Sequence, residues 1–241
     1  MVIAIREFIQ NSIMRSLLLT TLAAGVAALF TSCSNMPSSG GGGLAHYNAY
    51  NRPATLPANP RNVRVKVSTS NQMLYVMEGN KPLLVTPVSV GKPSSPTPKG
   101  NFRIFNKEHY HRANSHGFAY SGKQSKKCYL SAKPAGWSFK GTPMPYWCEF
   151  APNYGIHTGW VKPYPCTHGC IRLHHNVAPK FFKLVSIGTP VSIATTQPED
   201  KTIGRNVPRA PDAGPLPDFP NSMYIGNDYF TYHKPVKFEN Q

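Results

Sequence analysis

Acidic side chains are scarce in this 241-residue chain, which has 10 aspartates and glutamates against 26 lysines and arginines. Between residues 79 and 198 the only carboxylates are Glu108 and Glu149, and neither lies in a suggestive motif. A Ser-His-Asp triad or a pair of catalytic carboxylates would have to use these two residues. The sequence therefore disfavours both kinds of hydrolytic site.

The chain also lacks any internal repeat and has only short apolar runs. Residues 16–30 are apolar, but a membrane-spanning helix needs about 20 residues. Arg15 precedes this run and Thr31-Ser32-Cys33 follows it, which is the arrangement of a secretory signal peptide. We therefore predict that residues 1–32 are a signal peptide.

Phe30-Thr31-Ser32-Cys33 resembles a bacterial lipobox, in which the cysteine is lipidated and becomes the mature N-terminus. We expect lipidation of Cys33, a membrane partner through that lipid, and a location in the cell envelope facing the periplasm or wall. Ser34 would favour the outer membrane in a two-membrane bacterium. Ordinary cleavage and retention as an uncleaved anchor remain alternatives.

Without residues 1–32 the chain carries 24 basic and 9 acidic residues, a formal charge of +15. Such a charge favours polyanionic partners. Because the signal peptide directs the chain out of the cytoplasm, we expect anionic lipid or an acidic wall polymer, and no nucleic acid. The alternative is that the charge serves solubility alone.

Composition divides the remaining chain into three parts. The Ser-, Gly-, Asn- and Pro-rich residues 33–61 predict a flexible tether. Residues 62–196 predict a mainly β domain, and residues 197–241 are a Pro-rich C-terminal extension with no assigned role. Alternation and turn signals predict strands at residues 63–67, 73–77, 83–90, 102–105, 147–150, 155–158 and 191–194.

Two segments of the domain depart from the strand pattern. The Gly- and Lys-rich stretch of about 40 residues after 105 is predicted to be a long loop or lid. One helix is predicted with Asn176 as its N-cap, Pro179 in its first turn and Gly188 at its end. The expected fold is therefore mainly β with one main α-helix, flanked by irregular tails.

The segment from His157 to Leu173 contains the candidate chemistry. A nucleophilic cysteine needs a partner that stabilises its thiolate and donors for the developing oxyanion. His157 can be this partner of Cys170 if two strand ends bring them together. Gly169 lets the backbone approach a carbonyl closely, so the amides at Gly169 and Cys170 are candidate oxyanion donors. Because carboxylates are scarce, the group orienting His157 is expected to be the Thr158 hydroxyl or a backbone carbonyl.

His157-Thr158-Gly159 and Thr167-His168-Gly169-Cys170-Ile171-Arg172-Leu173 together resemble the signature of the L,D-transpeptidase (YkuD-type) catalytic domain. Thr97-Pro98-Lys99-Gly100-Asn101-Phe102 and Gly188-Thr189-Pro190-Val191 are further likenesses, and the similarity spans residues 63–194. The resemblance implies a β-sandwich-like catalytic domain.

The same resemblance implies an activity on peptidoglycan. Cys170 would form a thioester with a tetrapeptide stem, assisted by His157, and pass the acyl group to a stem amine, a protein or water. These acceptors correspond to cross-linking, protein attachment and L,D-carboxypeptidation. A catalytically idle wall-binding anchor is the alternative of another class.

The resemblance also implies supporting roles around this pair. Thr158 would help to set His157, His168 would line the pocket, and Gly169 would supply a backbone donor. Arg172 is expected to be a structural brace, with substrate contact as the alternative. Tyr146, Trp147, Tyr154 and Trp160 are candidates for stacking on stem or sugar, with core packing as the alternative.

The remaining cysteines and histidines leave further alternatives. The pairing of Cys128, Cys148 and Cys166 is undecided, and Cys166 is also a candidate for a regulatory disulfide with Cys170. The histidine spacing matches no known zinc motif such as H-E-x-x-H. We therefore predict no metal and no cofactor.

Overall fold

The computed structural model describes residues 42–212, 214 and 219–241. The predicted signal peptide, Cys33 and the first part of the predicted tether lie outside these residues. The described chain begins with α2 (Gly42–Ala49) and the short 3-10 helix η1 (Pro60–Asn62), and then enters a set of three β-sheets. None of the helices in this described part is long and apolar enough to cross a membrane.

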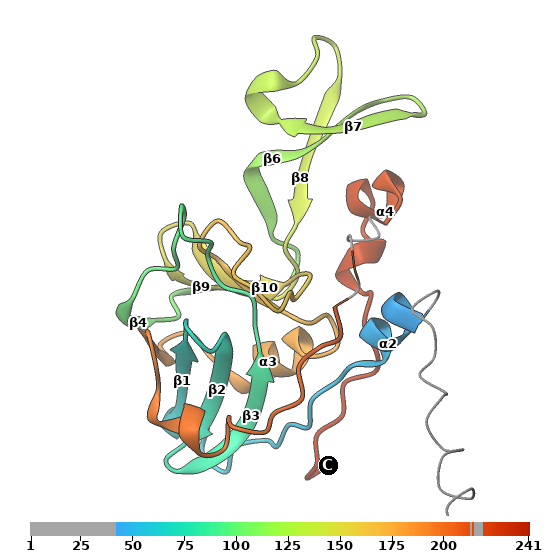
Figure 1. Cartoon of the computed structure of the whole chain (residues 1–241). Coiled ribbons are helices and arrows are strands. Elements are labelled where there is room, and N and C mark those ends of the chain that lie inside the picture. Colours follow the sequence, from blue (N-terminus) through green and yellow to red (C-terminus); the bar gives the residue numbers. More distant parts are fainter. Residues whose placement is uncertain (1–41, 213, 215–218) are drawn as a thin grey trace, which may run out of the picture. The chain divides into compact units, whose positions relative to one another are not determined.

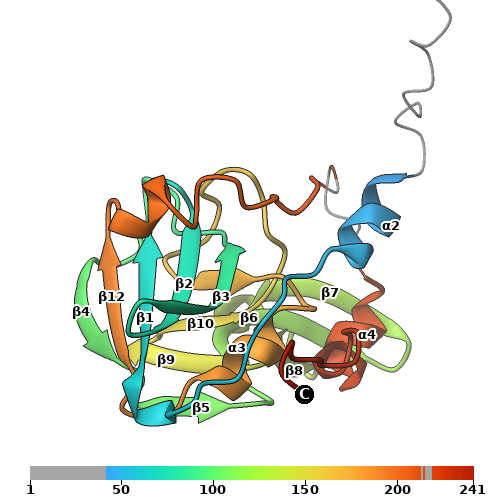
Figure 2. The same ribbon diagram turned by 90° about the horizontal axis from the view of Figure 1, so that it is seen from below.

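A five-stranded sheet forms one layer of the domain (Figure 2). Its strands lie in the order β3 (Lys81–Pro87), β2 (Met73–Glu78), β1 (Val63–Ser68), β12 (Pro190–Ala194) and β4 (Gly100–Arg103). The parallel pair β1–β12 joins the two ends of the domain sequence. Val63, Val65 and Val67 are buried while Arg64 is exposed, so the predicted alternation reflects one face packed on the core.

A four-stranded sheet carries the segment with the candidate chemistry. Its order is β11 (Ile171–Leu173), β10 (Tyr154–Thr158), β9 (Trp147–Ala151) and β5 (Asn106–Glu108). One hydrophobic cluster joins residues of both sheets, including Val65, Leu74, Ile156 and Ile171. The two sheets therefore share a core, and the mainly β prediction is confirmed.

The third sheet stands away from the other two in Figure 1 and is called the projecting sheet below. It consists of β7 (Gln124–Tyr129), β6 (Arg112–Ser121) and β8 (Ser138–Pro143), with the 3-10 helix η2 (Leu130–Ala132) after β7. The prediction of a long loop here is wrong. Most side chains of β7 are exposed, so the strand has no apolar alternation and is held mainly by its backbone pairing with β6.

The predicted helix is present as α3 (Ala178–Leu184), but Asn176 is not its cap. Val177 occupies the cap position, and the helix ends at Leu184, before Gly188. The Asn176 amide instead donates to the carbonyls of Asn48 and Tyr50, at 2.9 and 2.8 Å. Asn176 Oδ1 accepts a hydrogen bond from Lys234 N at 2.7 Å. This side chain therefore joins both flanking segments to the domain.

Residues 42–61 do not fit the expected flexible tether. Tyr47 in α2 is 1% exposed, and its hydroxyl accepts a hydrogen bond from Val161 N at 2.8 Å. Farther along, Ala54 is also buried and forms an isolated bridge with Leu84 of β3. Low apolar content predicts disorder, but a few well-placed buried residues hold this segment on the domain.

The C-terminal extension also packs on the domain. It contains the 3-10 helices η3 (Pro198–Lys201) and η4 (Asp228–Phe230), with α4 (Asn221–Ile225) before η4. The Tyr224 ring stacks on Phe118 of the projecting sheet, with ring centres 5.1 Å apart. The Arg112 guanidinium donates to the carbonyls of Tyr224 and Gly226, at 2.8 and 2.6 Å. The extension therefore supports the projecting sheet.

Candidate active site

Two adjacent parallel strands bring His157 and Cys170 to one place. His157 lies in β10, and its partner across the β10–β11 ladder is Arg172. Cys170 comes directly before β11, two residues ahead of Arg172. Both side chains line one cavity. The expectation that neighbouring strand ends assemble this pair therefore agrees with the geometry.

Two threonine hydroxyls hold the turn before Cys170. Thr167 Oγ1 donates to Cys170 O at 2.6 Å and accepts from Gly169 N at 3.0 Å. Thr97 Oγ1, from the loop before β4, donates to Gly169 O at 2.9 Å. The Gly169 amide is therefore engaged within the turn, which corrects its predicted role as an oxyanion donor. Sequence reasoning assigned no role to either threonine, although Thr167 lies in the signature and Thr97 in one of the outlying likenesses.

Gly169 is required by conformation and space. Its φ of +111° lies in a region that favours glycine. A Cβ at this position would lie 2.4 Å from Tyr154 Cε1. Tyr154 thus packs on the turn and, like Tyr146, is absent from the residues lining the cavities beside Cys170. Tyr146 is buried, with its hydroxyl 2.6 Å from His233 Nε2, so both tyrosines pack within the protein instead of facing the site.

His157 is oriented by a backbone carbonyl, one of the two predicted alternatives. Its Nδ1 lies 2.7 Å from Thr158 O, and because a carbonyl only accepts, Nδ1 carries the proton. In the neutral ring Nε2 is then the basic nitrogen. Burial, followed by the charge of Arg172, lowers the pKa of His157 to about 3. The histidine is therefore neutral at ordinary pH, with Nε2 unprotonated.

The Cys170 thiol also rests in its neutral form. Burial raises its pKa, with smaller opposing effects from the backbone at Gly155 and the charge of Arg172. Its Sγ–H points to Asn153 O at 3.7 Å. The resting site is therefore a thiol beside a neutral imidazole.

Cys170 lies where two cavities meet. The small cavity, about 220 Å³, is lined by His157, Thr158, Trp160 and Arg172 among others. The large cavity, about 920 Å³, lies between the projecting sheet and the β5–β9 edge, and contains Glu108, Glu149 and Trp147. Cys170 and His168 line both, as do His116 and Met144. His168 thus occupies its predicted place, and Trp160 and Arg172 face the small cavity.

The projecting sheet and the C-terminal extension both contribute to these walls. Phe118 and Thr142 of the projecting sheet line the small cavity together with Tyr224 and Tyr229 of the extension. No sequence motif assigned these four residues to the site, because their positions depend on contacts between distant segments. The site is therefore larger than the signature motif.

The other cysteines are free thiols in the described chain. Cys128, Cys148 and Cys166 are unpaired with one another and with Cys170. Cys148 is fully buried, and burial raises its pKa to about 12. Cys166 Sγ lies 3.9 Å from Arg172 Nη1, so Arg172 contacts this thiol as well as the small cavity. Within the described residues, no three His, Cys, Asp or Glu side chains gather as a metal site.

The family model for the L,D-transpeptidase catalytic domain, YkuD, matches residues 62–193. The chain belongs to this family. The match covers more than half of the chain and includes the paired strands and the turn that hold His157 and Cys170. It confirms the family resemblance carried by the signature residues.

Solved L,D-transpeptidases from several bacteria are similar to this YkuD-family chain. The enzyme from Stackebrandtia nassauensis is 23% identical, with 65% of this chain and 66% of that chain covered and a TM-score of 0.42. The L,D-transpeptidase from Mycobacterium smegmatis is 20% identical, with 55% of this chain and 58% of that chain covered and a TM-score of 0.43. The one from Enterococcus faecium is 25% identical, with 55% of this chain and 50% of that chain covered and a TM-score of 0.41. The chain thus spans about half to two thirds of these structures. Comparison with curated proteins gave no match.

Proposed function

We propose that this protein is a peptidoglycan L,D-transpeptidase that uses Cys170 as its nucleophile and His157 as its general base and acid. The observation that carries the proposal is the shared cavity of Cys170 and His157, with His157 Nδ1 fixed by Thr158 O. That hydrogen bond leaves Nε2 as the nitrogen that can exchange a proton with the reacting groups.

Acylation begins from the neutral pair. His157 Nε2 takes the thiol proton as Cys170 Sγ attacks the carbonyl carbon between stem residues three and four. The C–N bond then breaks, a thioester forms, and the departing D-alanine nitrogen takes the proton back from His157. The Cys170 amide is the remaining predicted donor to the oxyanion, since Gly169 N is bonded to Thr167.

Deacylation reverses these roles. The nitrogen of an acceptor amine attacks the thioester carbonyl and gives its proton to His157. The C–S bond breaks, and the thiolate that leaves takes this proton from His157. The new amide is a cross-link if the amine belongs to another stem, whereas attack by water gives a carboxypeptidase product.

The experiment is mass spectrometry of residues 34–241 incubated with purified tetrapeptide muropeptides. Dimers formed with loss of D-alanine are the expected product, and Cys170→Ala should form none. Tripeptides alone would replace the proposal by an L,D-carboxypeptidase. Absence of any Cys170-dependent product under reducing conditions would contradict both activities and favour the wall-binding anchor.

We also propose that the domain works in the cell envelope, anchored through lipid on Cys33. The support is the apolar run at residues 16–30 followed by Phe30-Thr31-Ser32-Cys33. Mass spectrometry of the mature N-terminal peptide should find lipid on Cys33, and Cys33→Ala should release the protein from membranes. An unmodified N-terminus at Ser34 would contradict the anchor without affecting the enzymatic proposal.

A further inference from the structure

We propose that the small cavity is a carboxylate-binding subsite for the D-alanine that leaves the acyl donor. This inference rests on the proposed function and assigns one part of the substrate to one wall of the site. It follows from three features of the small cavity: unsatisfied polar atoms, the sign of its charge, and the position of His157.

Three residues that line the small cavity each have a buried polar side-chain atom without a hydrogen-bond partner. These atoms are Thr158 Oγ1, Trp160 Nε1 and Thr142 Oγ1. Thr158 is 4% exposed and Trp160 is 9% exposed. Leaving a buried polar group unsatisfied costs about 1–3 kcal/mol, so such groups signal a ligand that completes them.

The chemistry of these atoms favours an anionic acceptor. The indole N–H of Trp160 only donates, and each threonine hydroxyl has one proton to donate. Arg172 lines the same cavity, and none of the described lining residues is acidic. A carboxylate accepts several hydrogen bonds and complements this charge. An ammonium group would meet Arg172 with the same sign of charge.

The position of His157 indicates that this carboxylate belongs to the leaving D-alanine. His157 lines the small cavity and is absent from the described residues that line the large one. A general acid must lie within hydrogen-bond reach of the nitrogen that it protonates. The leaving D-alanine nitrogen must therefore lie on the small-cavity side of Cys170, which directs its carboxylate toward Thr158 and Trp160.

Volume leads to the same assignment. The small cavity holds about 220 Å³, enough for one small residue, whereas the large cavity holds about 920 Å³. The rest of the donor stem is therefore assigned to the large cavity. After D-alanine departs, its place beside His157 is open to the acceptor amine.

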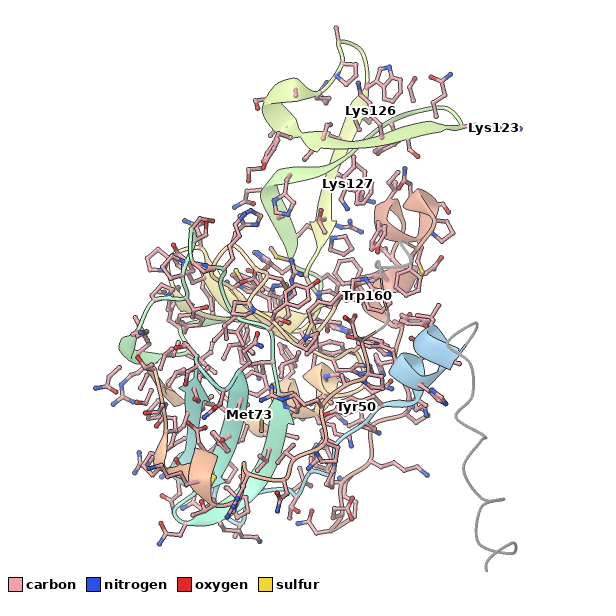
Figure 3. All side chains as sticks on the ribbon, in the orientation of Figure 1. Tyr50, Met73, Lys123, Lys126, Lys127 and Trp160 are labelled. Carbon is pink, nitrogen blue, oxygen red and sulfur yellow. The ribbon has the colours of Figure 1, made fainter. Side chains whose placement is uncertain are left out.

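The Trp160 indole is held in place by both flanking segments. Its ring lies 4.8 Å from Tyr47 of α2 and 5.5 Å, stacked, from Phe219 of the C-terminal extension. Figure 3 shows Trp160 where these two segments approach the base of the projecting sheet. An indole N–H fixed in this way needs no reordering to donate to a carboxylate, which favours both the affinity and the selectivity of carboxylate binding.

The test compares two donors that differ only at their C-terminus, a tetrapeptide muropeptide ending in D-alanine and the same molecule ending in D-alaninamide. The unaltered protein should prefer the carboxylate donor by roughly tenfold to a hundredfold in kcat/KM, because a buried site built for an anion discriminates against its neutral analogue. Equal use of the two donors would overturn the proposal.

Thr158→Val and Trp160→Phe should reduce this preference to near unity, while Thr158→Ser, which keeps the hydroxyl, should retain it. Thr231→Val and Trp137→Phe are matched controls, because Thr231 is exposed and neither residue lines the cavity. Thermal unfolding identifies variants that remain folded. Folded Thr158→Val and Trp160→Phe proteins with the full preference would also overturn the proposal.

Binding separates this inference from the proposed function. Calorimetry of Cys170→Ala with each donor needs no turnover, and it should give roughly tenfold tighter binding of the carboxylate form. Discrimination in binding without any turnover in the unaltered protein would count against transpeptidation alone. If the unaltered protein turns over both molecules equally and Cys170→Ala binds both equally, the result would count against the carboxylate subsite alone.

Discussion

Cys170 and His157 stay neutral at rest because burial disfavours the charged form of each. Burial raises the pKa of the thiol, whereas burial and the charge of Arg172 lower the pKa of the histidine to about 3. A preformed thiolate–imidazolium pair would require the opposite directions. Proton transfer is therefore expected to accompany attack on a bound substrate.

Alkylation of Cys170 should reflect this neutral resting state. We expect the rate with iodoacetamide to rise steadily from pH 6 to 9, because the thiolate fraction keeps increasing below a raised pKa. The rate is measured by mass spectrometry of the peptide that contains Cys170. A fast rate that is already constant at pH 6 would indicate an ion pair and contradict the neutral form.

Gly169→Ala should disable the site while the domain remains folded. The added Cβ would meet Tyr154 at 2.4 Å and the φ of +111° would be strained, so the turn must shift Cys170. We expect activity to fall roughly 100-fold, since a displacement of about 1 Å can have this effect.

The control for this change is Gly122→Ala in the hairpin of the projecting sheet. Gly122 also has a positive φ, of +56°, but its Cβ would meet nothing within 4 Å. It should lose some stability by thermal unfolding and keep its kcat. Equal activity of the two alanine variants would contradict a special role for the Gly169 turn.

At the scale of elements, the flanking segments behave as parts of the catalytic domain. Asn176 joins the end of α2 to the chain after η4, and Tyr47 supports Val161 at the start of the loop toward Cys170. In the same loop Lys162 is buried and pairs with Asp212, at 2.5 Å, from the C-terminal extension. The loop between His157 and Cys170 is thus held by both flanking segments.

Asn176→Ala should loosen both segments together. Loss of its three hydrogen bonds in a buried place is expected to reduce the free energy of unfolding by about 2–4 kcal/mol. Urea unfolding measures this change, and limited proteolysis should reveal new cleavage near residues 48–50 and 234. Asn227→Ala, at an exposed asparagine, is the matched control. If Asn176→Ala is as stable as Asn227→Ala, Asn176 does not join the two flanking segments to the domain.

Strands with a buried face were predictable, and those without one were not. Val63, Val65 and Val67 alternate because one side of β1 faces the core, whereas β7 exposes most of its side chains. The Asn176 cap prediction failed because three long-range hydrogen bonds outweigh a local cap preference. Likewise, a Ser- and Gly-rich composition gave no sign of the buried Tyr47.

Only those parts of the site that lie close together in the sequence could be predicted. Cys170, His157 and the carbonyl that orients it follow from one short stretch of sequence. Thr97 lies 72 residues from the Gly169 carbonyl that it holds, and Thr142 reaches the small cavity from the projecting sheet. Such partners depend on the fold as a whole.

The whole molecule contains buried neutral histidines besides His157. His174 is fully buried, and burial lowers its pKa to about 3. The pKa of His175 is lowered to about 4, again chiefly by burial. The ring of His174 packs on Tyr47, and the ring of His175 packs on Tyr232. Their neutrality is thus coupled to the packing of both flanking segments.

Stability should therefore fall as the solution becomes acidic. The unfolded chain binds protons at histidines near pH 6.5, whereas the folded chain does so only near pH 3 to 4. Because the unfolded state binds more protons in this range, each histidine should cost about 2 kcal/mol at pH 5 relative to pH 8. Urea unfolding at pH 8, 7, 6 and 5 measures the effect.

A variant pair isolates the contribution of one histidine. His175→Gln should make the decline with acid shallower, while His46→Gln, at an exposed position in α2, should leave it unchanged. A free energy of unfolding that stays constant from pH 8 to pH 5 would contradict the neutral buried state.

The packing of α2 on the domain determines how much chain is left to connect the domain to the proposed lipid anchor. With the proposed anchor at Cys33, only the chain up to Gly42 separates the lipid from the folded part, and nine residues span at most about 30 Å. A free segment extending to residue 61 would have reached roughly three times as far. The enzyme would then serve a thin layer of wall beside its membrane, and residues inserted before Gly42 would widen that layer.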